Sequence, residues 1–400
     1  MGGVRGGSRG KAPEAGQVSG KQGMRVLHVY RTYFPETQGG LEEAIRQICL
    51  ATQPLGVENT VFTLSTRPGA EMYLERPEAR VVRRRSWAAP ASCDLGGIGA
   101  LREFRRLARE ADVVHYLFPW PFADLLHLLA PAGKPSVLTY VSDIVRQRWL
   151  GRLYRPLMWR TLRQMDAIVA NSPAYARTSP VLSDPAVRDR VRVIPLGIDE
   201  SSVSQVPDPG ILDRLGIEGG EPFMLFVGVL RYYKGLHVLL QAAKSVNGRI
   251  VIAGEGPEGD ALRGQARALG LENVLFAGRV SDGEKSALLA QCCALVLPSH
   301  LRSEAYGMVL VEAAMAGKPM VTCEIGTGTS YINANGETGV VVAPENSTAL
   351  AAAMQRLLDD EALALRYGQA ARRRYECLFS GPAMGEGYMK MYADVLAKYR

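Results

Sequence analysis

The sequence lacks the features that would mark a zinc protein, a disulfide-linked protein or a membrane-spanning protein. Its six cysteines include no C-x-x-C pair, and no set of cysteines and histidines has the spacing of a zinc site. The five histidines are scattered without an H-E-x-x-H motif. The stretch that comes nearest to a membrane span, 113–131, is broken by Asp124, three prolines and two histidines. We therefore expect a cytoplasmic protein with reduced cysteines packed as small apolar residues.

The chain is long enough for two domains and moderately basic. Its 400 residues are 47% hydrophobic and 22% charged, which is typical of a globular protein. With 47 basic and 40 acidic residues, the formal charge is +7. This balance favours an anionic partner: nucleic acid, a phosphorylated ligand or an acidic membrane surface.

The first 23 residues carry part of this charge but no folding signal. They contain eight glycines, four basic residues and one acidic residue, and they lack the apolar core of a signal peptide. We predict that residues 1–23 form a disordered tail. A strand-like sequence follows Met24, which we interpret as the natural start.

Strand-like apolar runs alternate with segments of helical periodicity along the remainder, which predicts an α/β fold with parallel sheets. The predicted strands fall at 26–30, 61–65, 113–116, 136–140, 167–170 and 191–195, and then at 223–227, 250–253, 274–277, 294–297, 320–323 and 339–342. Residues 201–222, rich in Ser, Pro, Asp and Gly, predict a linker. We thus predict two Rossmann-like βαβ domains, 24–200 and 223–380, facing a cleft that binds ligands beyond the carboxyl ends of the strands.

The loop after the first strand of the second series has the features of a phosphate site. Gly228 lets the backbone approach a ligand closely, and Lys234-Gly235 opens a helix whose N-terminus favours anions. Arg231 and Lys234 are three residues apart and can reach one pyrophosphate together. The loop is neither a P-loop nor a G-x-G-x-x-G fingerprint, and a solvated basic turn is an alternative.

Two glutamates eight residues apart form a second candidate. Glu304 falls in the loop after a predicted strand, where an α/β sheet binds its ligand. Glu312 lies about two turns into the next helix among apolar residues, where a carboxylate is costly without a partner. Ribose hydroxyls would be such a partner, although two ordinary surface glutamates can have the same spacing.

Together these motifs resemble glycosyltransferase family 4, the retaining nucleotide-sugar enzymes of GT-B fold. Glu304 to Glu312 resembles the family's E-x7-E motif, and 228–235 resembles its G-x-L-x-x-x-K-G loop. Further similar segments follow the same order along the chain: Gly39-Gly40, P-L-G-I-D at 195–199 and G-E-G-P at 254–257. The resemblance implies a GT-B architecture in which a C-terminal helix, 381–400, crosses back to pack on the N-terminal domain.

The resemblance also implies roles for individual residues. Arg231 and Lys234 would bind the donor diphosphate and stabilise the leaving group. Glu304 would face the transferred sugar, and Glu312 would hydrogen-bond the ribose. Further donor contacts would come from Gly39, Gly40, Gly228 and the backbone amides near Tyr306, Gly307 and Met308.

Such enzymes are usually metal-independent and need no cofactor, and the chain has no D-x-D triplet. Cationic side chains and helix N-termini would then take the place of a divalent ion. The mechanism that the resemblance implies is retention by front-face substitution, in which the departing phosphate helps to deprotonate the acceptor hydroxyl. No protein nucleophile is required.

One segment departs from the family pattern. Val141 stands where many relatives have a histidine that touches the donor sugar, which puts that contact in doubt. Ser142 and Asp143 follow it and could take polar roles on the acceptor side of the cleft. A helix N-cap before residue 144 is an alternative role for Asp143.

Several segments, namely 30–35 with Gly39-Gly40, 142–147, 298–304 and 323–330, resemble bacterial lipopolysaccharide mannosyl- and rhamnosyltransferases in particular. This similarity implies a hexosyltransferase that uses a GDP-sugar, such as GDP-mannose or its 6-deoxy relative, in lipopolysaccharide or exopolysaccharide biosynthesis. A UDP-glucose-dependent transferase, a nucleotide-sugar epimerase, a phosphorolytic or sucrose-type enzyme and a non-catalytic nucleotide-sugar-binding protein are alternatives.

Arginine clusters in the N-terminal half indicate where the remaining positive charge acts. They occur at 83–85, at helical spacing between 102 and 109, and beside aromatic residues between 146 and 163. A basic helix with aromatic residues can lie on an anionic leaflet or bind a lipid-linked diphosphate acceptor. We expect a peripheral protein on the inner face of the plasma membrane and no nucleic-acid partner, because no recognition module is visible. Solvated arginines above an apolar helix face are an alternative.

Overall fold

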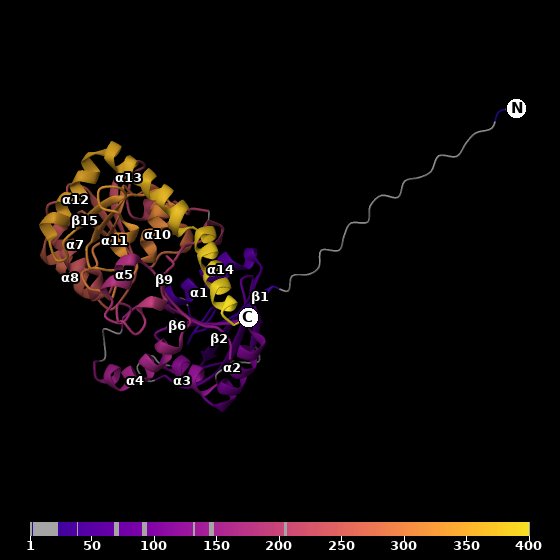
Figure 1. Cartoon of the computed structure of the whole chain (residues 1–400). Coiled ribbons are helices and arrows are strands. Elements are labelled where there is room, and N and C mark those ends of the chain that lie inside the picture. The colour runs from indigo at the N-terminus through magenta and orange to yellow at the C-terminus, as the bar shows by residue number, and fades with distance from the viewer. Residues whose placement is uncertain are drawn as a thin grey trace.

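The computed structural model describes Gly2 and residues 23–37, 39–67, 72–89, 94–130, 133–143, 148–203 and 206–399, with the backbone alone at 148–153. The tail predicted at 1–23 lies almost wholly outside these residues, as does 144–147, so the predicted N-cap role of Asp143 concerns undescribed residues. Figure 1 shows two lobes, each built around a β-sheet flanked by helices.

The N-terminal lobe contains a nine-stranded sheet in the order β3-β4-β2-β1-β6-β7-β8-β9, with β5 paired to β4. The strands are β1 (Met24–Val29), β2 (Val57–Ser65), β3 (Tyr73–Glu75), β4 (Arg80–Ala88), β5 (Leu95–Gly96), β6 (Val113–Phe118), β7 (Ser136–Tyr140), β8 (Ala167–Ala170) and β9 (Val191–Val193). All pairings are parallel except those of β3 and β5 with β4. The helices are α1 (Gly40–Thr52), α2 (Ile98–Glu110), α3 (Pro121–Leu129), α4 (Arg148–Gln164) and α5 (Pro173–Thr178).

The strands of this sheet are buried on both faces, which explains their continuous apolar sequences. Along β1, Val26 packs into the core that contains α1, whereas Leu27 packs into the core that contains α2 and α3. Successive side chains of a strand point to opposite faces, so helices must cover both sides of the sheet.

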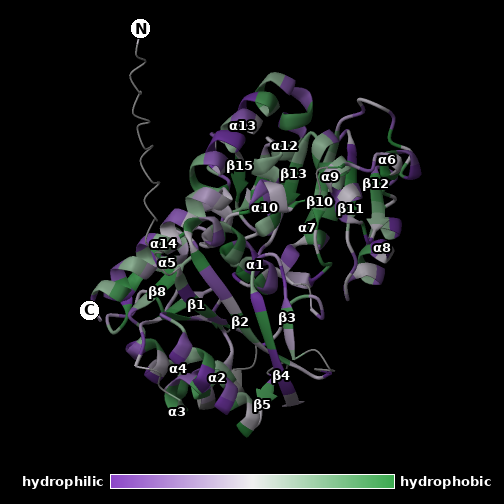
Figure 2. Cartoon of the chain, turned by 90° about the vertical axis from the view of Figure 1, so that its right-hand side faces the viewer, coloured by the Kyte–Doolittle hydropathy of each residue, from purple (hydrophilic) through white to green (hydrophobic). Residues whose placement is uncertain are grey.

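The C-terminal lobe contains a six-stranded parallel sheet in the order β12-β11-β10-β13-β14-β15. Its strands are β10 (Phe223–Val227), β11 (Arg249–Ala253), β12 (Val274–Gly278), β13 (Ala294–Leu297), β14 (Met320–Cys323) and β15 (Gly339–Val342). Its helices are α6 (Gly210–Arg214), α7 (Leu236–Ala243), α8 (Gly259–Ala268), α9 (Asp282–Gln291), α10 (Met308–Met315), α11 (Thr329–Ile332), α12 (Ser347–Asp359) and α13 (Glu361–Arg374). In Figure 2 the strands of this sheet are mostly green, and the helices around them carry both green and purple residues.

The chain ends in a helix that returns to the first lobe, so the predicted GT-B architecture is confirmed. A π-helix (Tyr375–Phe379) and Ser380 separate α13 from α14 (Gly381–Ala397). The Tyr388 hydroxyl lies 3.0 Å from Thr139 Oγ1, and the Tyr392 hydroxyl lies 2.8 Å from His115 Nδ1. In Figure 1, α14 is the yellow helix that runs beside α1 toward β1.

The sequence pattern does not predict β3, β4 and β5, and of the basic cluster predicted at 83–85 only Arg85 is exposed. Arg83 is buried in β4 and forms an ion pair with Glu36 at 2.6 Å. Arg84 forms an ion pair with Glu103 of α2 at 2.7 Å. These carboxylates come from distant segments, so the sequence pattern alone does not reveal that the arginines are neutralised.

The exact domain limits stay predictions. No helix in the described part of the chain is long and apolar enough to cross a membrane.

Candidate active site

Two loops at the carboxyl ends of β10 and β13 bring the predicted diphosphate site next to the predicted sugar site. Lys234 ends a short 3-10 helix, η5 (Tyr232–Lys234), and Glu304 lies in the loop after β13. The Lys234 ammonium forms an ion pair with the Glu304 carboxylate, which also accepts a hydrogen bond from Ser299 Oγ at 3.2 Å. Their side chains are only 12% and 9% exposed, so each charge depends on the other for compensation.

Two glycines allow the loop after β10 to approach its neighbours, the loop after β13 and the loop after β11. Gly235 has a φ angle of 71°, and a Cβ atom there would lie 2.0 Å from the carbonyl oxygen of Pro298. Gly254 has a φ angle of 134°, and its Cβ atom would lie 2.0 Å from the carbonyl oxygen of Gly228. A larger residue at 235 would push the lysine loop away from the glutamate loop.

Arg231 and the start of α10 add positive potential at the same edge of the sheet. Arg231 is exposed directly before η5. Gly307 is the N-cap of α10 with a φ angle of 89°, and no side chain caps this helix. The first N–H groups of a helix, here beginning at Met308, have no intrahelical acceptor and attract anions. The Tyr306 side chain is buried, and its hydroxyl donates a hydrogen bond to the carbonyl oxygen of Leu196 at 2.8 Å.

Glu312 is a largely buried carboxylate that pairs with a lysine. Lys285 Nζ of α9 lies 3.1 Å from Glu312 Oε1. Burial raises the pKa of Glu312, and the negative charges of Asp282 and Glu43 raise it further. The positive charge of Lys285 lowers this pKa and so acts against the other effects. Glu43 belongs to α1 of the N-terminal lobe. A cavity of about 470 Å³ is lined by both Glu312 and Lys285.

Gly39 and Gly40 lie exposed at the start of α1. A Cβ atom at Gly39 would lie 2.6 Å from a carboxylate oxygen of Glu42, which in turn accepts a hydrogen bond from Thr32 at 2.5 Å. Within the described residues, no hydrogen bond joins these two glycines to Lys234 or Glu304. Their predicted contact with the donor therefore stays a prediction.

Asp143 connects the two lobes. Its carboxylate accepts hydrogen bonds from the Tyr140 hydroxyl at 3.1 Å and from Ser179 Oγ at 2.7 Å. Arg302, two residues before Glu304, reaches across the lobes to Asp143 at 3.3 Å. Ser142 is partly buried beside it, and so is Val141. The acceptor-side residues predicted from the sequence therefore lie close to the loop that carries Glu304.

Comparison with known proteins identifies the family. A family model described as Glycosyltransferase Family 4 matches residues 38–202, and one described as Glycosyl transferases group 1 matches residues 210–374. D-rhamnosyltransferase WbpZ of Pseudomonas aeruginosa is 48% identical over 357 residues, covering 89% of this chain and 92% of that protein. The chain belongs to glycosyltransferase family 4.

A second curated relative and a solved structure are also similar to this chain. O-antigen chain mannosyltransferase C of Escherichia coli is 40% identical over 375 residues, covering 93% of this chain and 99% of that protein. Sucrose-phosphate synthase of Thermosynechococcus elongatus has a TM-score of 0.75 at 22% identity, covering 94% of this chain and all of that one. This structural similarity bears on the GT-B fold alone.

Some residues of this family-4 site were not predicted from the sequence. Arg302 also donates hydrogen bonds to Thr178 Oγ1 at 2.9 Å and to the carbonyl oxygen of Gly326 at 2.8 Å. Lys285, the partner of Glu312, lies 27 positions away in the chain. Arg302 lies in the segment 298–304 but was given no role from the sequence, and Lys285 lies in none of the similar segments; only folding brings their partners to them.

Proposed function

We propose that this glycosyltransferase moves a mannose- or rhamnose-type hexose from a GDP-sugar to a lipid-linked glycan, with retention of the anomeric configuration and without a metal ion. The observation that carries the proposal is the buried pair of Lys234 and Glu304 at the carboxyl ends of β10 and β13. The names of the two relatives, a rhamnosyltransferase and an O-antigen mannosyltransferase, support the sugar class and a role in lipopolysaccharide or exopolysaccharide biosynthesis.

The proposed chemistry depends on stabilising the negative charge of the leaving group. Lys234 and Arg231 would hold the diphosphate, and the N-terminus of α10 would face it with free N–H groups. As the bond from the anomeric carbon to the phosphate oxygen lengthens, negative charge develops on that oxygen. The same phosphate then takes the proton of the acceptor hydroxyl, which attacks from the same face.

Glu304 would change partners when the donor binds. In the structure its carboxylate compensates the charge of Lys234. A diphosphate beside Lys234 would supply that negative charge, and Glu304 would then be available to accept hydrogen bonds from hydroxyls of the transferred sugar. Glu312, at the cavity of about 470 Å³, would accept hydrogen bonds from the ribose hydroxyls.

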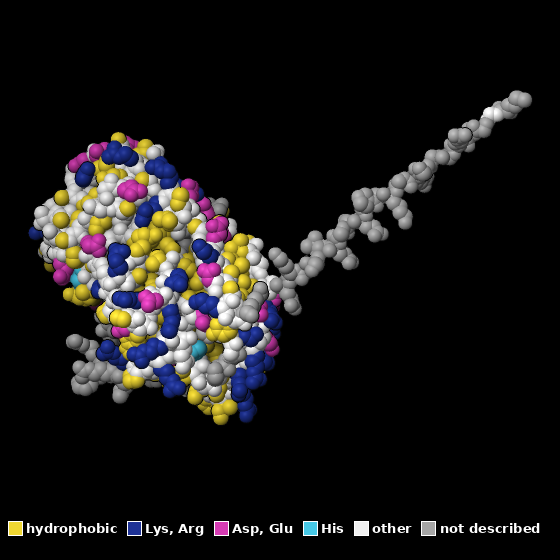
Figure 3. Space-filling view, viewed as in Figure 1, with side chains coloured by type: hydrophobic (Ala, Val, Ile, Leu, Met, Phe, Trp, Pro, Cys, Tyr) yellow, Lys and Arg dark blue, Asp and Glu magenta, His cyan; other side chains and the backbone are white. Residues whose placement is uncertain are grey.

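The acceptor would bind to the N-terminal lobe and bring the protein to the membrane. Arg102, Arg105 and Arg109 are exposed on α2, and Arg155, Arg160 and Arg163 are exposed on α4. Figure 3 shows Lys and Arg side chains along the lower rim of the molecule, over this lobe. These cations would contact anionic inner-membrane lipids or the diphosphate of a lipid-linked acceptor.

A donor panel tests the nucleotide assignment. We expect GDP to raise the melting temperature more than UDP or ADP, and radiolabelled GDP-mannose to label a lipid fraction more than UDP-glucose does. Lys234→Ala should abolish the shift with GDP, whereas Lys244→Ala, which removes an exposed lysine after α7, should keep it. A shift with UDP alone would favour the UDP-glucose alternative. If no nucleotide shifted the melting temperature, the proposed donor site would be contradicted.

One observation favours a non-catalytic nucleotide-sugar-binding protein as the second candidate. Val141 cannot make the sugar hydrogen bond that a histidine would make there. Such a protein would show the thermal shift with GDP but no transfer to any acceptor fraction. Transfer by the wild-type protein that Lys234→Ala abolishes would exclude it.

A further inference from the structure

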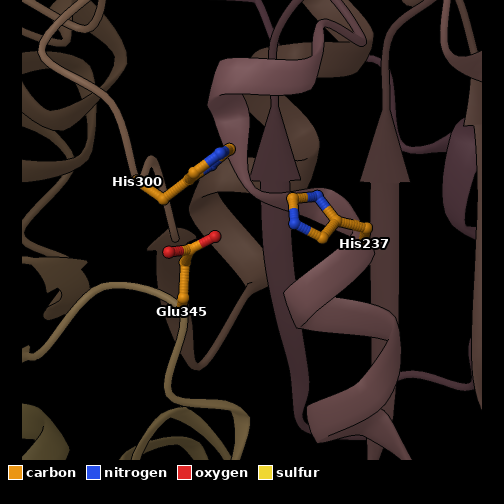
Figure 4. A group of neighbouring side chains, drawn as sticks. All are labelled: His237, His300 and Glu345. Atoms are coloured by element: carbon orange, nitrogen blue, oxygen red, sulfur yellow. The ribbon is translucent and has the colours of Figure 1, made fainter.

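Three potential metal ligands converge beside the loops of the candidate active site. His237 lies at the start of α7, His300 in the loop after β13, and Glu345 between β15 and α12. Their ligand atoms all lie within 4.8 Å of one another. Figure 4 shows that the side chains come from three separate segments and approach a common space.

His300 is the strongest sign that this cluster binds something. Its side chain is buried, with 8% exposure, and neither ring nitrogen has a hydrogen-bond partner among the described residues. Buried imidazole nitrogens without partners are unfavourable, because the ring loses its hydrogen bonds to water. A metal ion would give one of these nitrogens a partner.

Aromatic packing orients the two histidine rings. His237 stacks on Tyr232 with a centroid distance of 5.2 Å and an interplanar angle of 2°. His300 packs edge-on against both Tyr232 and His237, at 4.9 Å and 5.1 Å. The rings are therefore held by their neighbours, as a preformed ligand pair requires.

We infer that His237, His300 and Glu345 bind a divalent transition-metal ion of the zinc, nickel or cobalt class. Two neutral imidazoles and one carboxylate are ligands that such ions prefer, whereas magnesium and calcium prefer all-oxygen sites. The set supplies three ligands, so a water molecule or a bound molecule would complete a tetrahedral site.

The geometry requires only a small closure. Ligand atoms around tetrahedral zinc lie about 3.3 Å apart, given bonds of about 2.0–2.1 Å. Glu345 is exposed and lies in a loop, so rotation of its side chain can shorten the longer distances. Its φ angle is 58°, a left-handed conformation that is uncommon for glutamate.

The bound ion would connect the loops that carry the predicted donor residues. The backbone N–H group of His300 donates a hydrogen bond of 3.0 Å to the carbonyl oxygen of Tyr233, the neighbour of Lys234. His300 itself lies four residues before Glu304. The ion would thus tie α7, the loop after β13 and the loop before α12 together. We assign it no chemical step in sugar transfer.

Metal titration of the full-length, tag-free protein tests this inference. Zinc would be titrated against a fluorescent zinc indicator, and cobalt would be followed by visible absorption. We expect one zinc ion per chain, and at least a tenfold loss of zinc affinity in His237→Ala and in Glu345→Gln. Both residues are at least partly exposed, so these variants should fold even if His300→Ala does not.

His127→Ala is the matched control, because it removes a partly buried histidine from α3 in the other lobe. It should keep the wild-type zinc affinity. Equal affinity in wild type, His237→Ala and Glu345→Gln would overturn the inference. A cobalt spectrum with thiolate charge-transfer bands that survives His237→Ala would also overturn it, because it would assign the ion to cysteines.

Discussion

Gly385 lies where α14 crosses α1, and replacing it with alanine tests how closely the two lobes pack. A Cβ atom at Gly385 would lie 2.3 Å from the carbonyl oxygen of Ala51, well below the 3.0 Å that real contacts reach. The obstacle is the backbone of a helix and cannot rotate away as a side chain would. Either α14 must move by several tenths of an ångström or its contact with α1 must open.

The magnitude follows from two opposing effects. Alanine in a helix interior is favoured over glycine by about 0.5–1 kcal/mol. Overpacking of a close contact costs about 1–3 kcal/mol. We therefore expect Gly385→Ala to lower the free energy of unfolding by up to about 2.5 kcal/mol, with about 1 kcal/mol at the middle of the range.

Gly264 provides the control, because it lies inside α8 with no heavy atom within 4 Å of an added Cβ atom. Gly264→Ala should raise the free energy of unfolding by about 0.5–1 kcal/mol, since only the helix preference acts. Urea denaturation followed by circular dichroism measures both variants. If Gly385→Ala is as stable as Gly264→Ala, the close packing of α14 on α1 is refuted.

Three further predictions concern the ion pairs and a buried carboxyl. Glu304→Gln should lower the free energy of unfolding by about 3 kcal/mol, because it leaves the buried Lys234 ammonium without its carboxylate. The control Glu337→Gln, at an exposed residue, should change it by less than about 0.5 kcal/mol. Equal losses for the two variants in urea denaturation would contradict this prediction. Arg302→Ala should increase the radius of gyration measured by small-angle X-ray scattering without added nucleotide, because it removes contacts between the lobes. An unchanged radius would count against a cross-lobe role. Burial raises the pKa of Asp124 to about 7. The folded protein therefore keeps a proton on this carboxyl that the unfolded chain loses near pH 4, so the free energy of unfolding falls as pH rises from about 4 to 7. Asp124→Asn should therefore gain stability relative to wild type as pH rises from 5 to 7 and no further above that; a constant difference would refute the shift.

The strands of the C-terminal lobe were predictable from the sequence because they are parallel and lie between helices. Predicted strands at 223–227, 294–297, 320–323 and 339–342 agree with β10, β13, β14 and β15. Helices cover both faces of these strands, so their sequences are short continuous apolar runs. The edge strand β3 and its partner β4 have no such run, and β4 includes three consecutive arginines. Local sequence therefore favours a surface segment there.

The candidate site likewise has a part that the sequence predicts and a part that only the fold shows. Lys234, Glu304 and Glu312 stand in motifs with fixed spacing along the chain, and motif and family can be recognised without coordinates. The contacts between these residues cannot be recognised from the sequence, because Lys234 meets Glu304 only where β10 and β13 lie side by side. Glu312 likewise meets Lys285 only through the packing of α9 and α10.

The sequence gives the amount of positive charge on the protein but not which of its arginines are neutralised in the fold. Composition alone establishes an excess of positive charge and a preference for anionic partners. It cannot tell that Arg83 is neutralised internally by Glu36, while Arg155, Arg160 and Arg163 of α4 remain exposed. Ion pairs depend on distances of a few ångströms between segments far apart in the chain. Likewise, histidines 63 positions apart become one ligand cluster with Glu345 only in the fold. Local patterns thus established the α/β class and the family motifs, whereas the long-range pairings that complete each site were decided by tertiary packing.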